Sequence, residues 1–159
     1  TAYDYNALIE NFNSHLADDV TQNGAHGLNI EQGVFTPSFN VGNHTYGEQI
    51  GRYYRIGNIV HIFMRIQVTV ADKTPTEDLK IVGLPFPVYG HGGSITFGYV
   101  NNTTMPTNKP ILLGRITGYT SEITLTARGH ENQWPTLCKA SILNDGSEWY
   151  MSGSYLIGE

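Results

Sequence analysis

Charged side chains are scarce in this chain. Only 14% of its 159 residues are Asp, Glu, Lys or Arg, and the formal net charge at pH 7 is −5. Proteins that bind DNA or RNA concentrate Lys and Arg on one face, where they neutralise phosphates. The nine Lys and Arg of this chain are scattered along its length. We therefore expect no nucleic-acid partner.

Long apolar runs are lacking as well. A membrane-spanning helix needs about 18 or more consecutive apolar residues, and no such stretch is present. The chain also has no signal-peptide pattern. These two absences lead us to expect no membrane partner.

Cysteine occurs once, as Cys138. It shares one side of an alternating stretch with Ala140 and Ile142, which is typical of a small apolar residue packed in a strand. A reactive thiolate needs electropositive surroundings, and Lys139 is the one cation beside it. The sequence therefore predicts a buried, inert thiol.

Motifs for metal binding and catalysis are absent. The six histidines show none of the H-x-H, H-x-x-x-H or H-E-x-x-H spacings that converge on a metal. No G-x-S-x-G, P-loop or dinucleotide fingerprint is present. Asp72, Glu77 and Asp78 cluster around Pro75, and a solvated loop explains them more simply than the paired carboxylates of a glycosidase. We expect no metal, no cofactor and no metabolic enzyme activity.

Short strands separated by turn residues dominate the rest of the chain. Eighteen glycines and 11% aromatic residues are typical of a β-rich domain. After a Gly57-Asn58 corner, apolar residues alternate from Val60 to Val70, the period of a strand with one buried face. The expected strands are 34–41, 46–56, 59–70, 79–83, 93–100, 111–118, 122–128, 137–143 and 148–157. Asn144-Asp145-Gly146-Ser147 separates the last two, and its Asp-Gly pair favours the positive φ of a hairpin turn. This pattern predicts an all-β antiparallel sandwich with jelly-roll connectivity.

The first segment follows a helical period. Its apolar residues recur at spacings of three and four, which predicts a short amphipathic helix over residues 2–17. Asp18-Asp19 and the Gly- and Asn-rich stretch that follows predict a linker up to residue 30. We therefore expect a helix and linker at residues 1–30 and a β-sandwich domain at residues 31–159. A helix this short is marginal alone, so it must pack against something.

Two segments carry a resemblance to a known family. The first is Gly33-Val34-Phe35-Thr36-Pro37, and the second is the Gly-Arg-Tyr-Tyr-Arg-Ile-Gly-Asn hairpin at residues 51–58. Ile81-Val82-Gly83-Leu84-Pro85 and Ser152-Gly153-Ser154-Tyr155 follow in the same order. From about Gly33 to the C-terminus the chain resembles the β-sandwich module at the C-terminal ends of bacteriophage tailspikes and tail fibres. The resemblance identifies a scaffold and does not by itself assign a reaction.

The resemblance implies a phage assembly component. Such a module would be a jelly roll of the tumour-necrosis-factor-like kind that trimerises and acts as an intramolecular chaperone for the upstream tailspike or fibre region. It would reside in the virion, in the phage tail or an appendage, or in the host cytoplasm during assembly if it is released. A secreted trimeric ligand similar to complement-type globular heads shares this fold but lacks the phage motifs.

The residues themselves, apart from the resemblance, also predict a homotrimer. Ile59 and Phe63 lie on the long strand opposite its buried side, which places too much apolar surface on a solvated face. His61 lies beside them, where a structural or interfacial role is expected in preference to catalysis. On the predicted helix, Tyr5, Leu8 and Phe12 occupy a and d positions of two heptads and would extend the trimer interface.

Self-cleavage is a further possibility that the resemblance raises. Some tailspikes carry a C-terminal domain that cuts itself free, and a helix that leads into a jelly roll resembles this arrangement in the preneck appendages of small podoviruses. Cleavage near Thr1 would need an acid or base, and Asp4 and Glu10 are the only carboxylates in the predicted helix. Ordinary solvated helix polarity explains both residues more simply.

Aromatic residues near turns indicate an alternative function. Tyr89, Tyr119 and Trp134 are flanked by turn-forming and polar residues, and exposed rings edged by polar groups suit carbohydrate binding. They favour a retained receptor-binding tip that recognises host cell-wall glycan. Packing against the sandwich is an equally good interpretation of Trp134. For Trp149, which alternates with Met151, packing in the core is the simpler interpretation.

Overall fold

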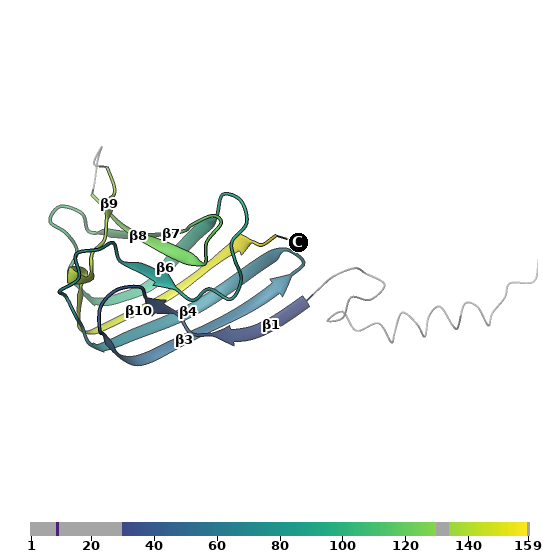
Figure 1. Ribbon diagram of the computed structural model, residues 1–159, viewed down its shortest axis with the longest axis horizontal. Coiled ribbons are helices and arrows are strands. Elements are labelled where there is room, and N and C mark those ends of the chain that lie inside the picture. The colour runs from purple at the N-terminus through teal and green to yellow at the C-terminus, as the bar shows by residue number, and fades with distance from the viewer. Residues whose placement is uncertain (1–8, 10–29, 130–133, 159) are drawn as a thin grey trace, which may run out of the picture.

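The computed structural model describes residue 9 and residues 30–129 and 134–158. Within these residues the chain forms ten strands and one short 3₁₀ helix (Figure 1). In chain order they are β1 (Ile30–Phe35), β2 (Ser38–Phe39), β3 (Thr45–Ile56), β4 (Ile59–Val70), β5 (Lys80–Val82), β6 (Gly93–Thr103), β7 (Ile111–Ile116), β8 (Glu122–Arg128), β9 (Thr136–Leu137), η1 (Ala140–Ile142) and β10 (Leu143–Leu156). The predicted helix over residues 2–17 and the linker after it lie outside the described residues.

The strands form one curled antiparallel sheet in the order β1-β3-β4-β10-β6-β7-β8-β5-β2, with β9 beside β8. β6 pairs with β7 only over Gly93 to Ile95, and the two ends of the order, β1 and β2, are joined through Thr36 and Pro37. The sheet therefore folds back on itself. We call β1, β3, β4, β10 and β6 the first layer, and β7, β8, β5 and β2 the second layer (Figure 1). The predicted all-β, antiparallel, sandwich-like fold is confirmed.

β4 provides the centre of the core. Its inward side chains, Val60, Ile62, Met64, Ile66 and Val68, are all buried, as the period of two predicts. Val70 was expected on the same side but is 54% exposed. β10 pairs with β4 only as far as Val68, so Val70 lies at the end of the sheet with a paired strand on one side only, at Thr45 of β3.

Trp149 of β10 lies in the same core and is 1% exposed. Its ring packs edge-on against Phe39 and Phe97, with centroid distances of 5.3 and 5.9 Å. Its indole Nε1 donates a hydrogen bond to Thr103 Oγ1 at 2.7 Å, which satisfies the one polar group that burial would otherwise penalise. The core interpretation of Trp149 is confirmed.

The strand predicted over residues 34–41 is two strands. β1 pairs with β3 in the first layer, whereas β2 pairs with β5 in the second. The break falls at Thr36-Pro37, because proline cannot donate to a strand ladder. Gln49 Nε2 donates to the Pro37 carbonyl oxygen at 3.0 Å and holds the chain where it crosses between layers.

The prediction of a continuous strand over residues 137–143 is wrong. β9 ends at Leu137, and η1 occupies Ala140–Ile142. Cys138 between them is fully buried; its N–H donates to the Leu125 carbonyl at 3.0 Å, and its carbonyl accepts from the Leu79 N–H at 2.8 Å. Burial raises the pKa of the Cys138 thiol to about 11, so the thiol stays protonated and inert.

The segment 144–147, predicted as a hairpin turn, is an irregular start of β10. The register of β10 against β6 shifts between Leu143 and Glu148. Ser147, which is 2% exposed, donates through its hydroxyl to the Asn102 carbonyl at 2.6 Å and accepts from the Asn144 N–H at 2.8 Å. These side-chain bonds replace ladder bonds, so the turn-forming residues make a bulge within a strand.

Replacing Ser147 with Ala should therefore destabilise the fold. The substitution leaves the Asn144 N–H without its acceptor and leaves the Asn102 carbonyl with one donor, Asn144 Nδ2, and we expect it to cost about 1–3 kcal/mol of unfolding free energy. Ser154→Ala on the same strand is the matched control, because Ser154 is exposed and its loss should cost under about 1 kcal/mol. Urea unfolding at one fixed protein concentration measures both. Equal effects would show that the Ser147 bonds do not stabilise the start of β10.

Candidate functional site

The outward face of the first layer is apolar. The strand registers place Ile59 and Phe63 of β4 between β3 and β10. Nine large apolar or aromatic side chains on this face are 42–77% exposed: Val34, Ile50, Tyr54, Ile56, Ile59, Phe63, Tyr99, Tyr150 and Leu156. We call this surface the apolar face. A solvated sheet face normally carries polar residues, and an exposed patch this large indicates an interaction site.

Sequence reasoning identified only two members of the apolar face, Ile59 and Phe63. The other seven lie on neighbouring strands. Ile50, Tyr54 and Ile56 of β3 follow the same period of two and so carry a signal that could have been found. Tyr99, Tyr150 and Leu156 join the face only through the pairing of β10 with β4 and of β6 with β10, which the sequence does not specify.

The charged residues that cluster on the apolar face are paired within the chain. Arg65 of β4 forms ion pairs with Glu48 on β3 and Glu148 on β10. Its Nε donates to Glu148 Oε1 at 2.8 Å, and its guanidinium carbon lies 5.1 Å from the ring centroid of Tyr150. The hydrogen bond to Glu148 is the main cause that raises the pKa of Arg65. Charges paired in this way enter an interface at a lower desolvation cost than a lone charge does.

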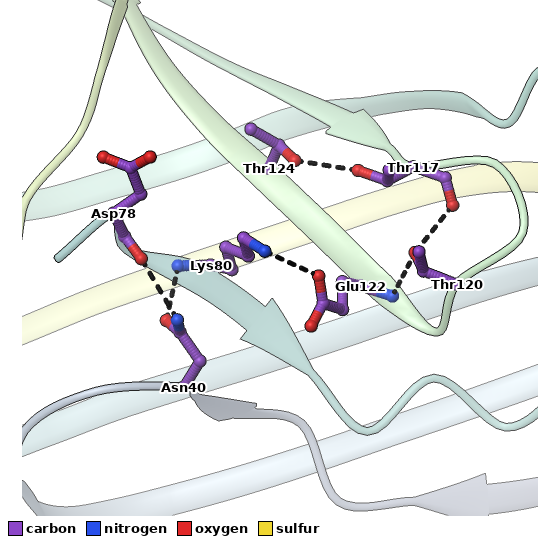
Figure 2. A network of polar contacts seen from close by, with 7 residues as sticks. All are labelled: Asn40, Asp78, Lys80, Thr117, Thr120, Glu122 and Thr124. Atoms are coloured by element: carbon purple, nitrogen blue, oxygen red, sulfur yellow. Dashed lines mark hydrogen bonds and ion pairs between the residues drawn. The ribbon is translucent and has the colours of Figure 1, made fainter.

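A polar network covers part of the second layer (Figure 2). Lys80 Nζ donates to Glu122 Oε2 at 2.8 Å between β5 and β8, and the Thr117 and Thr124 hydroxyls lie 2.8 Å apart. Asn40 extends the network, because its Oδ1 accepts from the Lys80 N–H at 2.7 Å. These contacts are those of a solvated sheet surface. The outward side of this layer also carries Ile111, Leu113 and Leu137, which are 38–41% exposed. Among the described residues, the two outer faces therefore differ in how many exposed large apolar side chains they carry, nine on the first layer against these three.

His61 lies on the apolar face and contacts a serine. Its Nδ1 is 2.8 Å from Ser154 Oγ, directly across the pairing of β4 with β10. A catalytic Ser–His pair also needs a group that orients the imidazole. Within the part of the chain that the structure describes, no carboxylate hydrogen-bonds to His61. Its position is that of a structural or interfacial residue, and its role stays a prediction.

The three loop aromatics lie in two places. Tyr89 and Tyr119 form an edge-to-face pair with ring centroids 6.0 Å apart, and they are 58% and 76% exposed. Trp134 is 88% exposed and comes shortly before β9, which pairs with the C-terminal end of β8. Tyr119 comes shortly before the N-terminal end of β8. Because the seven residues of β8 span roughly 20 Å, the structure brings the two tyrosines together and leaves Trp134 apart.

Tight backbone packing fixes the tyrosine pair. The Tyr119 N–H donates to the Val88 carbonyl at 2.9 Å, and the Val88 N–H donates to the Thr120 carbonyl at 2.8 Å. A Cβ on Gly118 would lie 1.9 Å from the Gly90 carbonyl oxygen, so the two loops approach closely only because Gly118 has no side chain. Tyr119 has a φ of 61°, in the left-handed region that side chains disfavour. Strained residues of this kind cluster at functional positions.

Asp72 organises the loop after β4. Its carboxylate accepts from the Asn43 N–H at 2.9 Å and from the Thr74 N–H and hydroxyl at 3.0 and 2.7 Å. The bond from Asn43, followed by those from Thr74, lowers the pKa of Asp72 to about 2. Asp78 pairs with Lys139 at 2.6 Å, and Glu77 is exposed. These three carboxylates thus lie in a solvated loop, as predicted.

Several predicted site residues lie outside the described residues. They are Asp4 and Glu10, proposed for self-cleavage, and Tyr5, Leu8 and Phe12, proposed for the trimer interface. Among the residues that are described, no group of three His, Cys, Asp or Glu side chains is arranged to hold a metal ion. No helix found there is long and apolar enough to cross a membrane.

The fold has a counterpart among solved structures. No protein-family profile matches the chain, and no curated protein matches its sequence. The crystal structure of the Dettilon tailspike protein is similar to it with a TM-score of 0.66 and 17% sequence identity. The match covers 79% of this chain and 23% of that chain. At this identity the similarity shows a shared fold with part of a phage tailspike.

The Asp72 bonds should make stability depend on pH at the acid end. The folded protein holds the proton of Asp72 more weakly than the unfolded chain, because the pKa falls from 3.8 to about 2 on folding. The stabilisation is therefore present above about pH 4 and is lost as the pH falls towards about 2. Asp72→Asn should lower the unfolding free energy at pH 7, and its difference from the unmodified chain should shrink over that range.

Urea unfolding at a series of pH values measures this difference. Glu77→Gln is the matched control, because it makes the same carboxylate-to-amide change on an exposed side chain of the same loop. A difference between Asp72→Asn and the unmodified chain that stays constant from pH 7 to pH 2 would contradict the pKa shift.

Proposed function

We propose that this chain is the C-terminal trimerisation and assembly domain of a bacteriophage tailspike or tail fibre. The observation that carries the proposal is the apolar face, on a fold similar to part of a tailspike. Its nine members are about half exposed. At about 150–250 Å² per large side chain, they leave roughly 900 Å² of surface accessible, close to the ~800 Å² that each partner buries in a standard interface.

Three copies would turn their apolar faces towards a common axis. Cyclic closure lets every copy bury the same surface, with no face left open for further growth. The polar network of Lys80, Glu122 and Thr124 would then face solvent. A jelly roll of the tumour-necrosis-factor-like kind suits this arrangement, and the apolar positions Tyr5, Leu8 and Phe12 would add contacts near the axis.

The assembly role follows from a covalent connection to the upstream tailspike region. Once three C-terminal domains associate, the upstream segments are held at high effective concentration and in register. The domain thereby acts as an intramolecular chaperone. Release by self-cleavage, with Asp4 and Glu10 as acid or base, would follow assembly, because orientation of the reacting groups supplies much of the rate.

The trimer can be tested with two isoleucines of similar exposure. Ile59 on the apolar face is 45% exposed, and Ile111 on β7 of the second layer is 39% exposed. Sedimentation equilibrium of the unmodified chain should give three times the 17.6 kDa chain mass. Ile59→Glu should shift the protein to the 17.6 kDa species, because it buries an unpaired charge in the interface. Ile111→Glu should leave the trimer intact.

Two results would contradict the proposal. If the unmodified chain sediments as a 17.6 kDa monomer at micromolar concentration, the chain does not form the proposed trimer. If Ile111→Glu dissociates the trimer and Ile59→Glu leaves it intact, the interface lies on the second layer instead. Circular dichroism of each variant distinguishes dissociation from unfolding.

A second candidate is a retained receptor-binding tip that recognises host cell-wall glycan. The observation that favours it is the tyrosine pair, Tyr89 and Tyr119, which is exposed and yet held rigidly. The Tyr119 backbone is strained, and Gly118 allows the two loops to approach closely. Core packing does not explain either feature, because the rings that they position are exposed to solvent.

Tyr119→Ala tests this candidate, with Trp134→Ala as the control at the other end of β8. Loss of one stacking ring should weaken binding to purified host cell walls at least about tenfold, a change of about 1.4 kcal/mol. Trp134→Ala should leave binding unchanged. Both variants should unfold within about 0.5 kcal/mol of the unmodified chain, because both side chains are exposed. Equal binding by the Tyr119 variant and the unmodified chain would exclude the tyrosine pair as the site.

A further inference from the structure

Gly98 in β6 is a glycine that the fold of one chain does not require. Its φ lies outside the left-handed region, and a Cβ added there would meet no atom closer than the Tyr150 carbonyl oxygen, at 3.8 Å. Every other strand glycine of the described residues either has a positive φ or would place a Cβ within 2.9 Å of a neighbouring atom. Glycine loses more conformational freedom on folding than any other residue. Its presence at position 98 therefore needs a reason from outside the single chain.

A β-bulge at this position does not supply that reason. Tyr150 and Met151 of β10 pair with Tyr99 and Phe97 of β6, so Gly98 is the extra, unpaired residue. The type of bulge that requires glycine places it in the left-handed region, and Gly98 is not in that region. Other residue types can occupy a bulge of the remaining kinds. Glycine inside a strand also occurs where another molecule approaches closely.

The missing side chain at Gly98 opens a hollow of about 350 Å³ on the apolar face. Its apolar lining comprises Ile50, Phe63, Met64, Tyr150 and Met151, with Arg52 also at the site. Met64 and Met151 are core residues, each 4% exposed. Their side chains lie on the inner side of the sheet, so these two residues contribute to the outward hollow through their backbone.

We propose that this hollow is a socket for an apolar side chain from a second copy of this chain, and that Gly98 keeps the socket open. The inference rests on the proposed trimer and specifies a central contact of its interface. Side chains that fill desolvated pockets within an interface contribute most of its binding energy. The socket would be such a pocket, because it lies among the exposed members of the apolar face.

Charge favours a second copy as the occupant. Arg65 is already paired with Glu48 and Glu148, so this cluster does not select an oppositely charged partner. All nine Lys and Arg, and ten of the fourteen Asp and Glu, fall in residues 30–159. Two copies of this part of the chain are each nearly neutral and repel one another little. The area of the apolar face is also the area that one partner buries in a stable interface.

Gly98→Leu tests the socket by filling it. The unmodified chain should sediment as a trimer, and Gly98→Leu should sediment as a folded 17.6 kDa monomer at the same concentration. Thr126→Leu adds the same side chain to the outward side of β8 and should remain trimeric. A trimeric Gly98→Leu protein, beside a monomeric Ile59→Glu protein, would overturn the socket and leave the proposed trimer standing. A monomeric unmodified chain would overturn both.

A thiol at position 98 identifies the occupant and covers the case in which Gly98→Leu does not fold. Gly98→Cys adds a small side chain, and the native Cys138 is fully buried, so maleimide labelling reports on position 98. Labelling should be at least about tenfold slower in the trimer than in the Ile59→Glu background, because a covered thiol reacts only when the interface opens. Equally fast labelling in both would show that nothing covers the socket. Equally slow labelling in both would show that the chain's own residues cover it. Either result would overturn the proposal.

Discussion

The structure depends on the apolar inner face of β4. Val60 to Val68 fill the core on one side, and their burial holds the two layers together through contacts with the second layer and with Trp149. On the other side, Ile59 and Phe63 continue the apolar surface across the neighbouring strands. A strand at the centre of a sheet normally balances a buried face against a solvated one. Here the outward face carries exposed apolar side chains, so in the proposed trimer the same strand would link folding of one chain to association between chains.

The difference between the two layers gives the domain an orientation. The second layer carries threonines and the Lys80–Glu122 ion pair, which are stable in water. The first layer carries aromatic and branched side chains, and its Arg65 is neutralised by carboxylates on both flanking strands. A closed assembly of identical copies can bury every first layer while every second layer stays solvated. The tyrosine pair lies on loops at an end of the sandwich, so it could remain accessible in such an assembly.

Local periodicity allowed the sequence to predict most of the strands. The hairpin at Gly57-Asn58 and the alternation along β4 are recorded in adjacent residues, and both were confirmed. The errors occurred where distant contacts decide the local structure. Pro37 divides one predicted strand because β1 and β2 pair in different layers. Ser147 turns a predicted hairpin into a bulged strand because its hydroxyl reaches Asn102 across the sheet. Grouping Tyr89 with Tyr119, and separating Trp134 from both, likewise depends on where β8 begins and ends.

Glycine shows most clearly which information only the structure contains. The chain has 18 glycines, and in the sequence each could mark a turn, a bulge or a close approach. The contacts around the strand glycines distinguish them. Tyr53 packs over Gly33, and Phe35 packs over Gly51, so those positions serve the fold. Gly98 differs because the space above it is empty and apolar. The proposed socket accounts for this difference, because an apolar side chain from a second copy would occupy the space that a side chain at position 98 would otherwise fill.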